Sequence, residues 1–363
     1  MYDFVVVGAG PAGSRFSRRA TERGYDVLTL ERGAVGKPLA CSGHVSTDIW
    51  KFTPEGAREE LLQNEVYGAR FHVGGPGSDN YQFYKREVVS NVIDRVGLDE
   101  RLAEAAREAG ADLRENHSVS AVEEYDDRVE VTASTPEGTE TFEAKMVAGC
   151  DGPVSRVRSD LGLPEPGEKL QGVLAFSEED DPGDYVDVHL TAPRFFAWRI
   201  PRGDSGVEYG LAAPPGSDPS AKDLFAEFTD EYDVETSHFC AGMIPVGPAE
   251  SVTSRRGFLI GDAAAQTKPF TGGGILYGMT SADHAASEVD PERPGTLQNY
   301  EEAWRGDLSR EIQLGHWIRK AYSLPEGFQK AGLSAFSGEI GVHMDKPTSF
   351  FSKEQLKKLL SGS

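Results

Sequence analysis

The chain has 363 residues, with 59 acidic and 37 basic side chains, and its formal net charge is −22. A chain of this length exceeds one typical domain, so we expect one large domain or two intergrown domains with a sizeable core. A surface this acidic repels nucleic acid and argues against a DNA or RNA partner. The charge fits an ordinary acidic protein, and it equally fits adaptation to high internal salt, where screening makes self-repulsion tolerable.

The sequence carries no sign of targeting, membrane-spanning or metal-binding segments. Its first residues enter an apolar stretch without a basic leader or a small-residue cleavage site. No apolar run approaches the ~20 residues that span a bilayer. Cys41, Cys150 and Cys240 contain no C-x-x-C pair and are fewer than the roughly four thiolates of an iron–sulfur cluster. We therefore expect a cytoplasmic protein, reduced and without a bound metal.

The N-terminal residues have the pattern of a strand–helix–strand unit. Phe4–Val7 is a short apolar run, typical of a parallel strand buried on both faces. An Ala- and Arg-rich stretch then predicts a helix that Gly24 ends. Val27–Leu30 predicts a second strand, which runs into Glu31.

A G-x-G-x-x-G motif occupies the turn between that first strand and the helix. In such a motif Gly8 makes the tight turn, Gly10 lets a pyrophosphate approach the backbone, and Gly13 lets the helix pack on the strand. Glu31 follows 18 positions past the last glycine and can accept hydrogen bonds from a ribose diol. A purely structural glycine turn is the alternative. The complete strand–helix–acid context favours a dinucleotide site.

The next hundred residues give mixed signals. Residues 46–87 are predicted to be irregular, and a helix beginning at Lys85-Arg86-Glu87 is expected to carry the apolar positions of 88–96. Arg86 is unfavourable at a helix start because that end prefers anions. It is either a surface side chain or one held in place by a phosphate or carboxylate.

Regular elements then follow to residue 160. We expect a helix over about 99–109, a hairpin of 129–132 with 139–144, and a short buried strand at 146–149. That strand ends in Cys150-Asp151-Gly152 before a basic helix start, which looks like another turn facing the nucleotide.

The pattern changes to alternating strands of antiparallel character in the middle of the chain. These strands are expected at 172–176, 185–190, 195–200 and 207–211, followed by a helix over 221–232 and a strand over 237–241. The aromatic side chains in these strands form either the core face of the sheet or the wall of an apolar pocket.

The last third returns to glycine-rich and helical sequence. A strand over 255–260 delivers Gly261 and Asp262, and Gly272–Gly274 precede a helix that begins near Ile275. Three glycines before a helix leave N–H groups bare, so this stretch is either a solvated turn or a ligand-binding loop. From residue 296 the chain is predicted to be helical. Residues 350–360 carry three lysines, and this segment either packs against the rest of the protein or contacts anionic lipid.

Taken together, these motifs resemble the FAD-binding p-hydroxybenzoate hydroxylase-like group. Within it the chain is most similar to the geranylgeranyl reductase family, whose archaeal members saturate the isoprenoid chains of membrane ether lipids. The motifs that carry the resemblance are Gly8-x-Gly10-x-x-Gly13 with Glu31, Arg86, Gly149-Cys150-Asp151-Gly152, and Gly261-Asp262 with Pro269-x-x-Gly272-Gly273-Gly274. Two local motifs narrow it: Pro38-x-x-Cys41-x-Gly43 matches P-x-x-C-x-G, and Phe196-x-Trp198-x-Ile200-Pro201-x-Gly203 departs from Y-x-W-x-F-P-x-G at two of five positions.

The resemblance implies a mixed α/β fold in three parts. We expect a Rossmann-like FAD-binding domain of the glutathione-reductase type at 1–45, 88–160 and 250–295. An inserted antiparallel-sheet substrate domain is expected at 46–87 and 161–249, and a helical C-terminal region at 296–363.

The resemblance also implies FAD as cofactor and assigns residues to it. Glu31 binds the adenosine ribose, Arg86 lies by the phosphates or ribose, and Asp262 contacts the pyrophosphate–ribitol part. The loop amides of 272–274 face the flavin ring, where a helix N-terminus stabilises negative charge on the reduced form. The expected cofactor-binding residues are Gly8, Gly10, Ala12, Gly13, Glu31, Arg32, Cys41, Gly43, Arg86, Asp151, Gly261, Asp262, Gly272, Gly273, Gly274 and Ile275. The expected substrate-pocket residues are Phe196, Trp198, Pro201 and Gly203.

The implied activity is reduction of isolated double bonds in an isoprenoid lipid substrate. Hydride comes from reduced flavin and a proton from a donor for which Cys41 is our hypothesis. NAD(P)H or a ferredoxin-like protein supplies the electrons, and the C-terminal helix makes a peripheral contact with the inner face of the membrane. The alternatives are a flavin monooxygenase of the same fold and a non-enzymatic prenyl-lipid escort protein. An electron-transfer flavoprotein–quinone oxidoreductase is disfavoured by the cysteine count.

Overall fold

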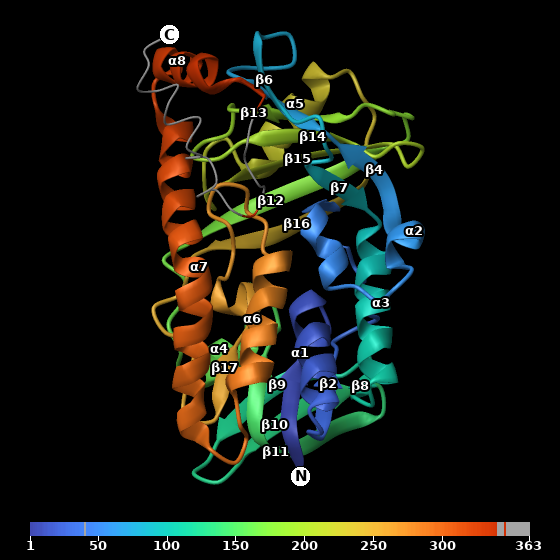
Figure 1. The fold of residues 1–363 in the computed structure, drawn as a ribbon, viewed down its shortest axis with the longest axis vertical. Coiled ribbons are helices and arrows are strands. Elements are labelled where there is room, and N and C mark those ends of the chain that lie inside the picture. Colours follow the sequence, from blue (N-terminus) through green and yellow to red (C-terminus); the bar gives the residue numbers. More distant parts are fainter. Residues whose placement is uncertain (40, 340–344, 346–363) are drawn as a thin grey trace.

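The computed structural model describes residues 1–39, 41–339 and Asp345. In this part of the chain the strands form a seven-stranded, an eight-stranded and a three-stranded sheet. In Figure 1 the seven-stranded sheet lies in the lower half and the eight-stranded sheet in the upper half, and the long helix α7 (Leu297–Lys320) runs along one side of both. The mixed α/β fold expected from the sequence is confirmed.

The seven-stranded sheet has the order β8-β2-β1-β11-β10-β9, with β17 also paired to β11. Its strands are β1 (Tyr2–Val7), β2 (Val27–Leu30), β8 (Asp112–Arg114), β9 (Ser118–Glu124), β10 (Val129–Thr135), β11 (Gly138–Gly149) and β17 (Gly257–Leu259). The long strand β11 joins the expected hairpin and the expected strand at 146–149: it is antiparallel to β10 and parallel to β1 and β17. All four residues of β2 are buried, as a strand covered on both faces requires.

Helices cover this sheet and complete its core. They are α1 (Pro11–Glu22), α3 (Arg95–Glu108), α4 (Arg156–Asp160), α6 (Ile275–Glu288) and α7. Short 3-10 turns occupy Gly261–Ala264 and Pro294–Thr296. Phe4, Phe16 and Phe258 meet edge to face in the core, and Tyr300 of α7 packs against Phe258. The first and last thirds of the chain therefore share one core.

The segment between residues 44 and 94 differs from the sequence expectation. It contains β3 (His44–Ser46), a 3-10 helix (Thr47–Lys51), α2 (Ala57–Leu61), β4 (Leu62–Val66), β5 (Gly68–His72), β6 (Asn80–Tyr84) and β7 (Ser90–Ile93). The helix expected over 88–96 is wrong, because β7 is a buried strand between β3 and β4. Periodicity does not separate a short strand buried on both faces from a buried helix. The helix begins instead at Arg95, where the Asp94 carboxylate accepts hydrogen bonds from the N–H groups of Val96 and Gly97.

The eight-stranded sheet has the order β16-β12-β15-β14-β13-β5-β6-β18. Its further strands are β12 (Glu168–Ser177), β13 (Tyr185–His189), β14 (Ala197–Pro201), β15 (Val207–Ala213), β16 (Ser237–Val246) and β18 (Gly338–Glu339). The expected antiparallel strands are confirmed, although β13 runs parallel to β5. Helix α5 (Ala221–Glu231) buries Phe225 and Phe228 against this sheet.

The C-terminal region is helical as far as it is described. After α7 the chain makes a 3-10 turn (Ala321–Ser323) and forms α8 (Glu326–Phe336). The lysine-bearing helix expected at 350–360 lies outside the described residues. Among the helices that the structure describes, none combines the length and apolar character needed to cross a membrane.

Candidate functional site

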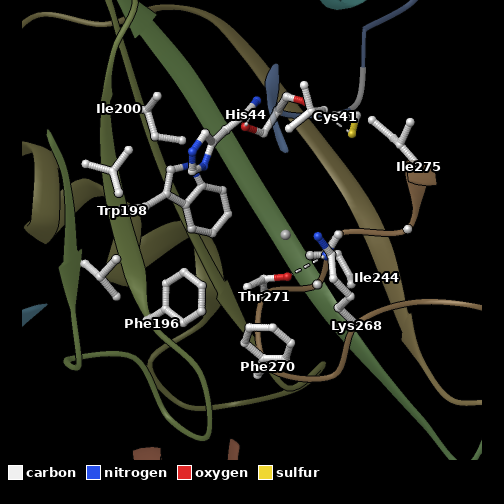
Figure 2. Close-up of a pocket in the computed structure, with 18 of the residues that line it drawn as sticks. Cys41, His44, Phe196, Trp198, Ile200, Ile244, Lys268, Phe270, Thr271 and Ile275 are labelled. Carbon is white, nitrogen blue, oxygen red and sulfur yellow. Dashed lines mark hydrogen bonds between the residues drawn. The ribbon is translucent and has the colours of Figure 1, made fainter. Parts of the chain in front are cut away.

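A cavity of 1330 Å³ is lined by the loops that follow strands of the seven-stranded sheet and by strands of the eight-stranded sheet, and Figure 2 shows part of its wall. One part of the wall comes from the glycine-rich ends of α1 and α6, and another from β12, β13, β14 and β16. Single-ligand pockets usually measure about 300–1,000 Å³. The cavity is therefore large enough for a dinucleotide together with part of a second ligand.

The three glycines of the N-terminal motif have three different environments. Gly8 has φ +98°, and a Cβ on it would lie 2.5 Å from the Cys150 carbonyl oxygen. A Cβ on Gly13 would lie 2.0 Å from the carbonyl oxygen of Gly8, so this position needs glycine for helix–strand packing. A Cβ on Gly10 would meet no atom within 4 Å, and Gly10 lines the cavity. The space beside Gly10 is thus the place where a ligand can reach the backbone.

Two helices open onto the cavity without a side-chain cap. Helix α1 has Gly10 as its N-cap and α6 has Gly274, and neither first turn contains an acidic residue. Both glycines line the cavity. Uncapped N–H groups and the positive end of a helix dipole favour an anion. The two helix ends therefore suit the pyrophosphate of FAD and the electron-rich edge of its reduced ring.

Glu31 and Arg32 stand at the carboxyl end of β2 and line the cavity. The Glu31 carboxylate accepts a hydrogen bond from the N–H of Ala9 at 2.7 Å, which ties it to the glycine turn. Ala12, on the first turn of α1, also lines the cavity. This arrangement keeps a carboxylate beside the turn, at the position where a ribose diol meets it in dinucleotide folds.

Arg95 is a buried basic residue of this site, which the sequence analysis missed. Arg95 is the first residue of α3, is only 9% exposed and lines the cavity. Its Nη1 forms an ion pair with Asp99 Oδ1 at 2.6 Å, but neither Nη1 nor the buried Nε has a well-aligned hydrogen-bond partner among the described residues. An unsatisfied donor on a cavity wall fits a phosphate or ribose oxygen of the cofactor.

Arg86 lies elsewhere. Its side chain is 85% exposed, its Nε lies 3.5 Å from Glu339, and it is not among the lining residues. The structure gives no support to its expected contact with FAD. A basic residue is unfavourable at a helix start, and this argument applies to Arg95 instead of Arg86, because α3 begins at Arg95. The sequence indicated this start through Asp94, a standard N-cap residue.

The loop after β17 brings Asp262 against the glycines before α6. A Cβ on Gly274 would lie 2.5 Å from Asp262 Oδ1, so only glycine fits there. The N–H of Gly261 donates to the Gln266 side chain at 2.7 Å, which holds the turn. Burial raises the pKa of Asp262 to about 6, and the charge of Arg95 opposes this shift. Gly261, Asp262, Gly272, Gly273, Gly274 and Ile275 all line the cavity, as expected.

Polar side chains gather where the Cys41 loop meets this glycine loop. Figure 2 shows His44 and Cys41 on one side of Lys268 and Thr271. Burial raises the pKa of the Cys41 thiol, against the effect of Arg95, so the thiol keeps its proton at neutral pH. His44 Nε2 lies 2.6 Å from Ser90 Oγ, and burial and then Lys268 lower the pKa of His44 to about 4. Lys268 is buried and bonded to Asp345 at 2.6 Å. Sequence reasoning found no role for Lys268.

Aromatic and aliphatic side chains form the opposite wall. Phe196, Trp198 and Ile200 from β14 and the residue before it line the cavity (Figure 2). Phe196 stacks on Phe195 with ring centroids 4.3 Å apart. The indole of Trp198 lies against Gly210 of β15, where a Cβ would come within 2.2 Å of the ring. This wall suits an apolar chain.

Six other expected site residues shape the fold rather than the wall. Gly8, Gly13 and Gly43 pack against backbone, and a Cβ on Gly43 would lie 2.3 Å from the Ile93 carbonyl oxygen. Pro201 ends β14 and Gly203, at φ +61°, makes the turn to β15, so neither lines the cavity. The Asp151 carboxylate accepts from Ser155 Oγ and from the N–H groups of Arg156 and Val157. These bonds hold the Asp151 carboxylate at the start of α4, and Asp151 is not among the residues that line the cavity.

Exposed apolar side chains near α8 border the cavity. In the described part of the chain seven large apolar side chains are exposed, and four of them lie between residues 317 and 336: Trp317, Leu324, Phe328 and Phe336. The last three also line the cavity. We call these four residues the apolar rim. Exposed apolar side chains of this kind at the edge of a cavity suit a hydrophobic ligand.

Comparisons with known proteins agree with this geometry. A family described as FAD binding domain matches residues 1–192. Digeranylgeranylglycerophospholipid reductase 1 of Methanococcoides burtonii is 30% identical over 88% of this chain and 84% of its own length. Digeranylgeranylglycerophospholipid reductase 2 of Methanothermobacter thermautotrophicus is 29% identical over 88% of this chain and 87% of its own.

Solved structures of the same fold cover nearly the whole chain. A geranylgeranyl bacteriochlorophyll reductase-like protein from Thermoplasma acidophilum has a TM-score of 0.83 and 22% identity, covering 99% of this chain and 98% of its own. The p-nitrophenol 4-monooxygenase of Pseudomonas putida has a TM-score of 0.74 and 18% identity, covering 100% and 97%. At these identities the two structures establish the fold alone.

Proposed function

Since the chain belongs to the digeranylgeranylglycerophospholipid reductase family of FAD-binding proteins, we propose that it saturates isolated double bonds in the geranylgeranyl chains of archaeal membrane ether lipids. The observation that carries this proposal is a cavity with two chemically different walls. One wall has uncapped helix ends and Arg95, which suit FAD, and the other has Phe196, Trp198 and Ile200, which suit a prenyl chain.

The chain's own residues bind and orient the reactants. The first turn of α1, with Gly10 at its cap, binds the pyrophosphate, and Glu31 binds the adenosine ribose. Asp262 and the N–H groups before α6 orient the ring end of the cofactor. When bound and reduced, FAD supplies the hydride for one carbon of the alkene. The aromatic wall holds the chain and excludes water, at roughly 0.8 kcal/mol for each buried CH₂ group.

The other alkene carbon needs a proton, and Cys41 is our candidate donor. Its thiol lies in the cavity wall and stays protonated because burial raises its pKa. Transfer of the Sγ proton to carbon would leave a thiolate beside Arg95, whose charge stabilises it. Cys41→Ala with unchanged turnover would remove this assignment.

The substrate and the reductant reach the cavity from outside the protein. We propose that the lipid enters from the membrane through the apolar rim, so that the enzyme acts in peripheral contact with the inner face of the membrane. NAD(P)H or a ferredoxin-like protein is the proposed electron donor. Ser in place of Phe328 and Phe336 should weaken sedimentation with lipid vesicles and leave FAD binding unchanged. Equal sedimentation of this variant and the wild type would contradict the membrane contact.

Two further proposals concern the chain as a whole. The strands of the seven-stranded sheet come from both ends of the chain, which supports an FAD-binding domain at 1–45, 88–160 and 250–295 and a substrate domain at 46–87 and 161–249. The net charge of −22 supports adaptation to high salt. If so, dialysis into low salt should lower the unfolding temperature by several degrees, whereas an unchanged fold in low salt would contradict it.

The proposed activity is tested with purified protein under anaerobic conditions. The flavin released by denaturation should be FAD by mass spectrometry. In the intact protein, the bound flavin is first reduced by dithionite. It should then be reoxidised when a geranylgeranyl ether lipid is added, and not when the fully saturated lipid is added. Absence of bound flavin, or equal reoxidation by both lipids, would contradict the proposal. The monooxygenase alternative predicts reoxidation by oxygen with an aromatic substrate, and no feature of the apolar wall favours it.

A further inference from the structure

A buried carboxylate lies behind the aromatic wall and accepts a hydrogen bond from one of its side chains. Glu208, on β15, is 0% exposed. Burying a carboxylate is costly unless its hydrogen bonds and charge are matched, so an apolar side chain would serve packing alone better. The contacts of Glu208 indicate what it does instead.

The first contact fixes the Trp198 indole. The indole Nε1–H donates to Glu208 Oε1 at 2.9 Å. Trp198 pairs with Gly210 across the two strands, and Glu208 lies two residues before Gly210, so Trp198 and Glu208 are diagonal neighbours on one face of the sheet. Gly210 gives the ring room to lie against the strand, and Glu208 sets its direction. Because Trp198 lines the cavity, its orientation decides the shape of the apolar wall.

The second neighbour of this carboxyl is the loop that carries Cys41. Burial raises the pKa of the Glu208 carboxyl, and the Trp198, Ser42 and Gly43 donors act against this shift. Glu208 Oε2 has no hydrogen-bond partner among the described residues. Arg202 is the positive charge that acts on this carboxyl, and its guanidinium Nε donates to Gln63 instead. Among the described residues the Glu208 carboxylate thus forms no salt bridge, and its hydrogen bond is the one from the Trp198 indole.

We propose that Glu208 is a positioning residue, which fixes the direction of the Trp198 indole and so sets how a prenyl chain lies along the apolar wall. This inference rests on the proposed function. It concerns the substrate wall, and it leaves the FAD-binding residues untouched.

The test compares Glu208→Leu and Glu208→Gln in the FAD-loaded protein. Leu removes the acceptor for the indole N–H, and Gln keeps an amide oxygen in nearly the same place. Loss of a hydrogen bond to a charged group changes an equilibrium constant by a factor of about ten or more. Glu208→Leu should therefore raise KM for the lipid about tenfold. Glu208→Gln should recover most of this loss. Glu227→Leu and Glu227→Gln, on the exposed side of α5, are the matched controls and should behave as wild type.

A second readout separates positioning from a general loss of structure. Glu208→Leu should change the near-ultraviolet circular dichroism of the tryptophans, and this change should vanish in a Trp198→Phe background. The double variant should also be no worse than Trp198→Phe alone in KM, because both remove the same contact. FAD affinity should stay within about threefold of wild type in each variant, since a shift of ~0.5 kcal/mol or less is expected away from that site.

Three outcomes overturn the inference. They are a wild-type KM in Glu208→Leu, a dichroism change that persists without Trp198, and additive effects in the double variant. If the wild type reduces no lipid, the proposed function fails; the dichroism pair and lipid affinity measured by quenching of flavin fluorescence then decide the role of Glu208 alone.

Discussion

Replacement of Gly10 by alanine is the sharpest test of where the cofactor binds. Gly10 has φ −67° and ψ −175°, an extended conformation that alanine adopts freely, and an added Cβ would meet no protein atom within 4 Å. The folded apoprotein should therefore tolerate Gly10→Ala within about 0.5 kcal/mol. The new methyl group, however, stands in the cavity at the N-terminus of α1, where a pyrophosphate oxygen must approach the N–H groups.

The expected magnitude follows from one lost contact. A hydrogen bond to a charged group contributes about 1.5–3 kcal/mol, and ~1.4 kcal/mol is a factor of ten, so FAD affinity should fall about ten- to a hundredfold. Titration of apoprotein with FAD, followed by flavin fluorescence, measures this, and a thermal melt of the apoprotein checks the fold. Gly306→Ala, on α7 with equal space around its Cβ, is the control and should not alter binding. Wild-type FAD affinity in Gly10→Ala would refute the placement of the pyrophosphate.

Three further outcomes follow from the same geometry. Gly210→Ala places a methyl group within 2.2 Å of the Trp198 ring, so KM for the lipid should rise about three- to tenfold through displacement of the indole while FAD affinity is kept, and a wild-type KM would contradict the wall. Cys41→Ala should lower turnover at unchanged FAD affinity, Cys41→Ser should recover part of it, and stopped-flow reoxidation of the reduced flavin measures both. Burial raises the pKa of Asp262 from 3.8 to about 6. Between these two pH values the folded apoprotein binds more protons than the unfolded chain, so its free energy of unfolding falls as pH rises from about 4 to 6. Asp262→Asn should remove that part of the slope in urea titrations, and an unchanged slope would contradict the assignment.

The elements at the two ends of the chain were predictable because local signals agree there. Phe4–Val7, the three glycines and Glu31 follow one another in one strand–turn–helix–strand unit, in which β1 pairs directly with β2. The strand–glycine–helix pattern around Asp262 and Ile275 is also continuous in sequence. In both stretches the local sequence signals agree with the fold that forms.

The region 44–96 was not predictable, since its strands depend on distant partners. Ser90–Ile93 is a strand because β3 and β4 flank it, and β5 is held by β13, more than a hundred residues later. The misplaced helix start moved the basic residue of the site from Arg95 to Arg86. Lys268 and Glu208 were missed for a related reason: each acquires its meaning from tertiary partners, Asp345 for one and Trp198 for the other.

The most direct test of the central claim is the mass of the lipid after a single anaerobic turnover with dithionite-reduced, FAD-loaded protein. A geranylgeranyl ether lipid should gain two hydrogen atoms for each double bond reduced, and two deuterium atoms when flavin reduction and turnover are both run in heavy water, because the transferable hydrogen of reduced flavin and the proton of a donor such as the Cys41 thiol both exchange with solvent. An unchanged lipid mass in the presence of bound, reduced flavin would contradict the assignment of this protein as a double-bond reductase.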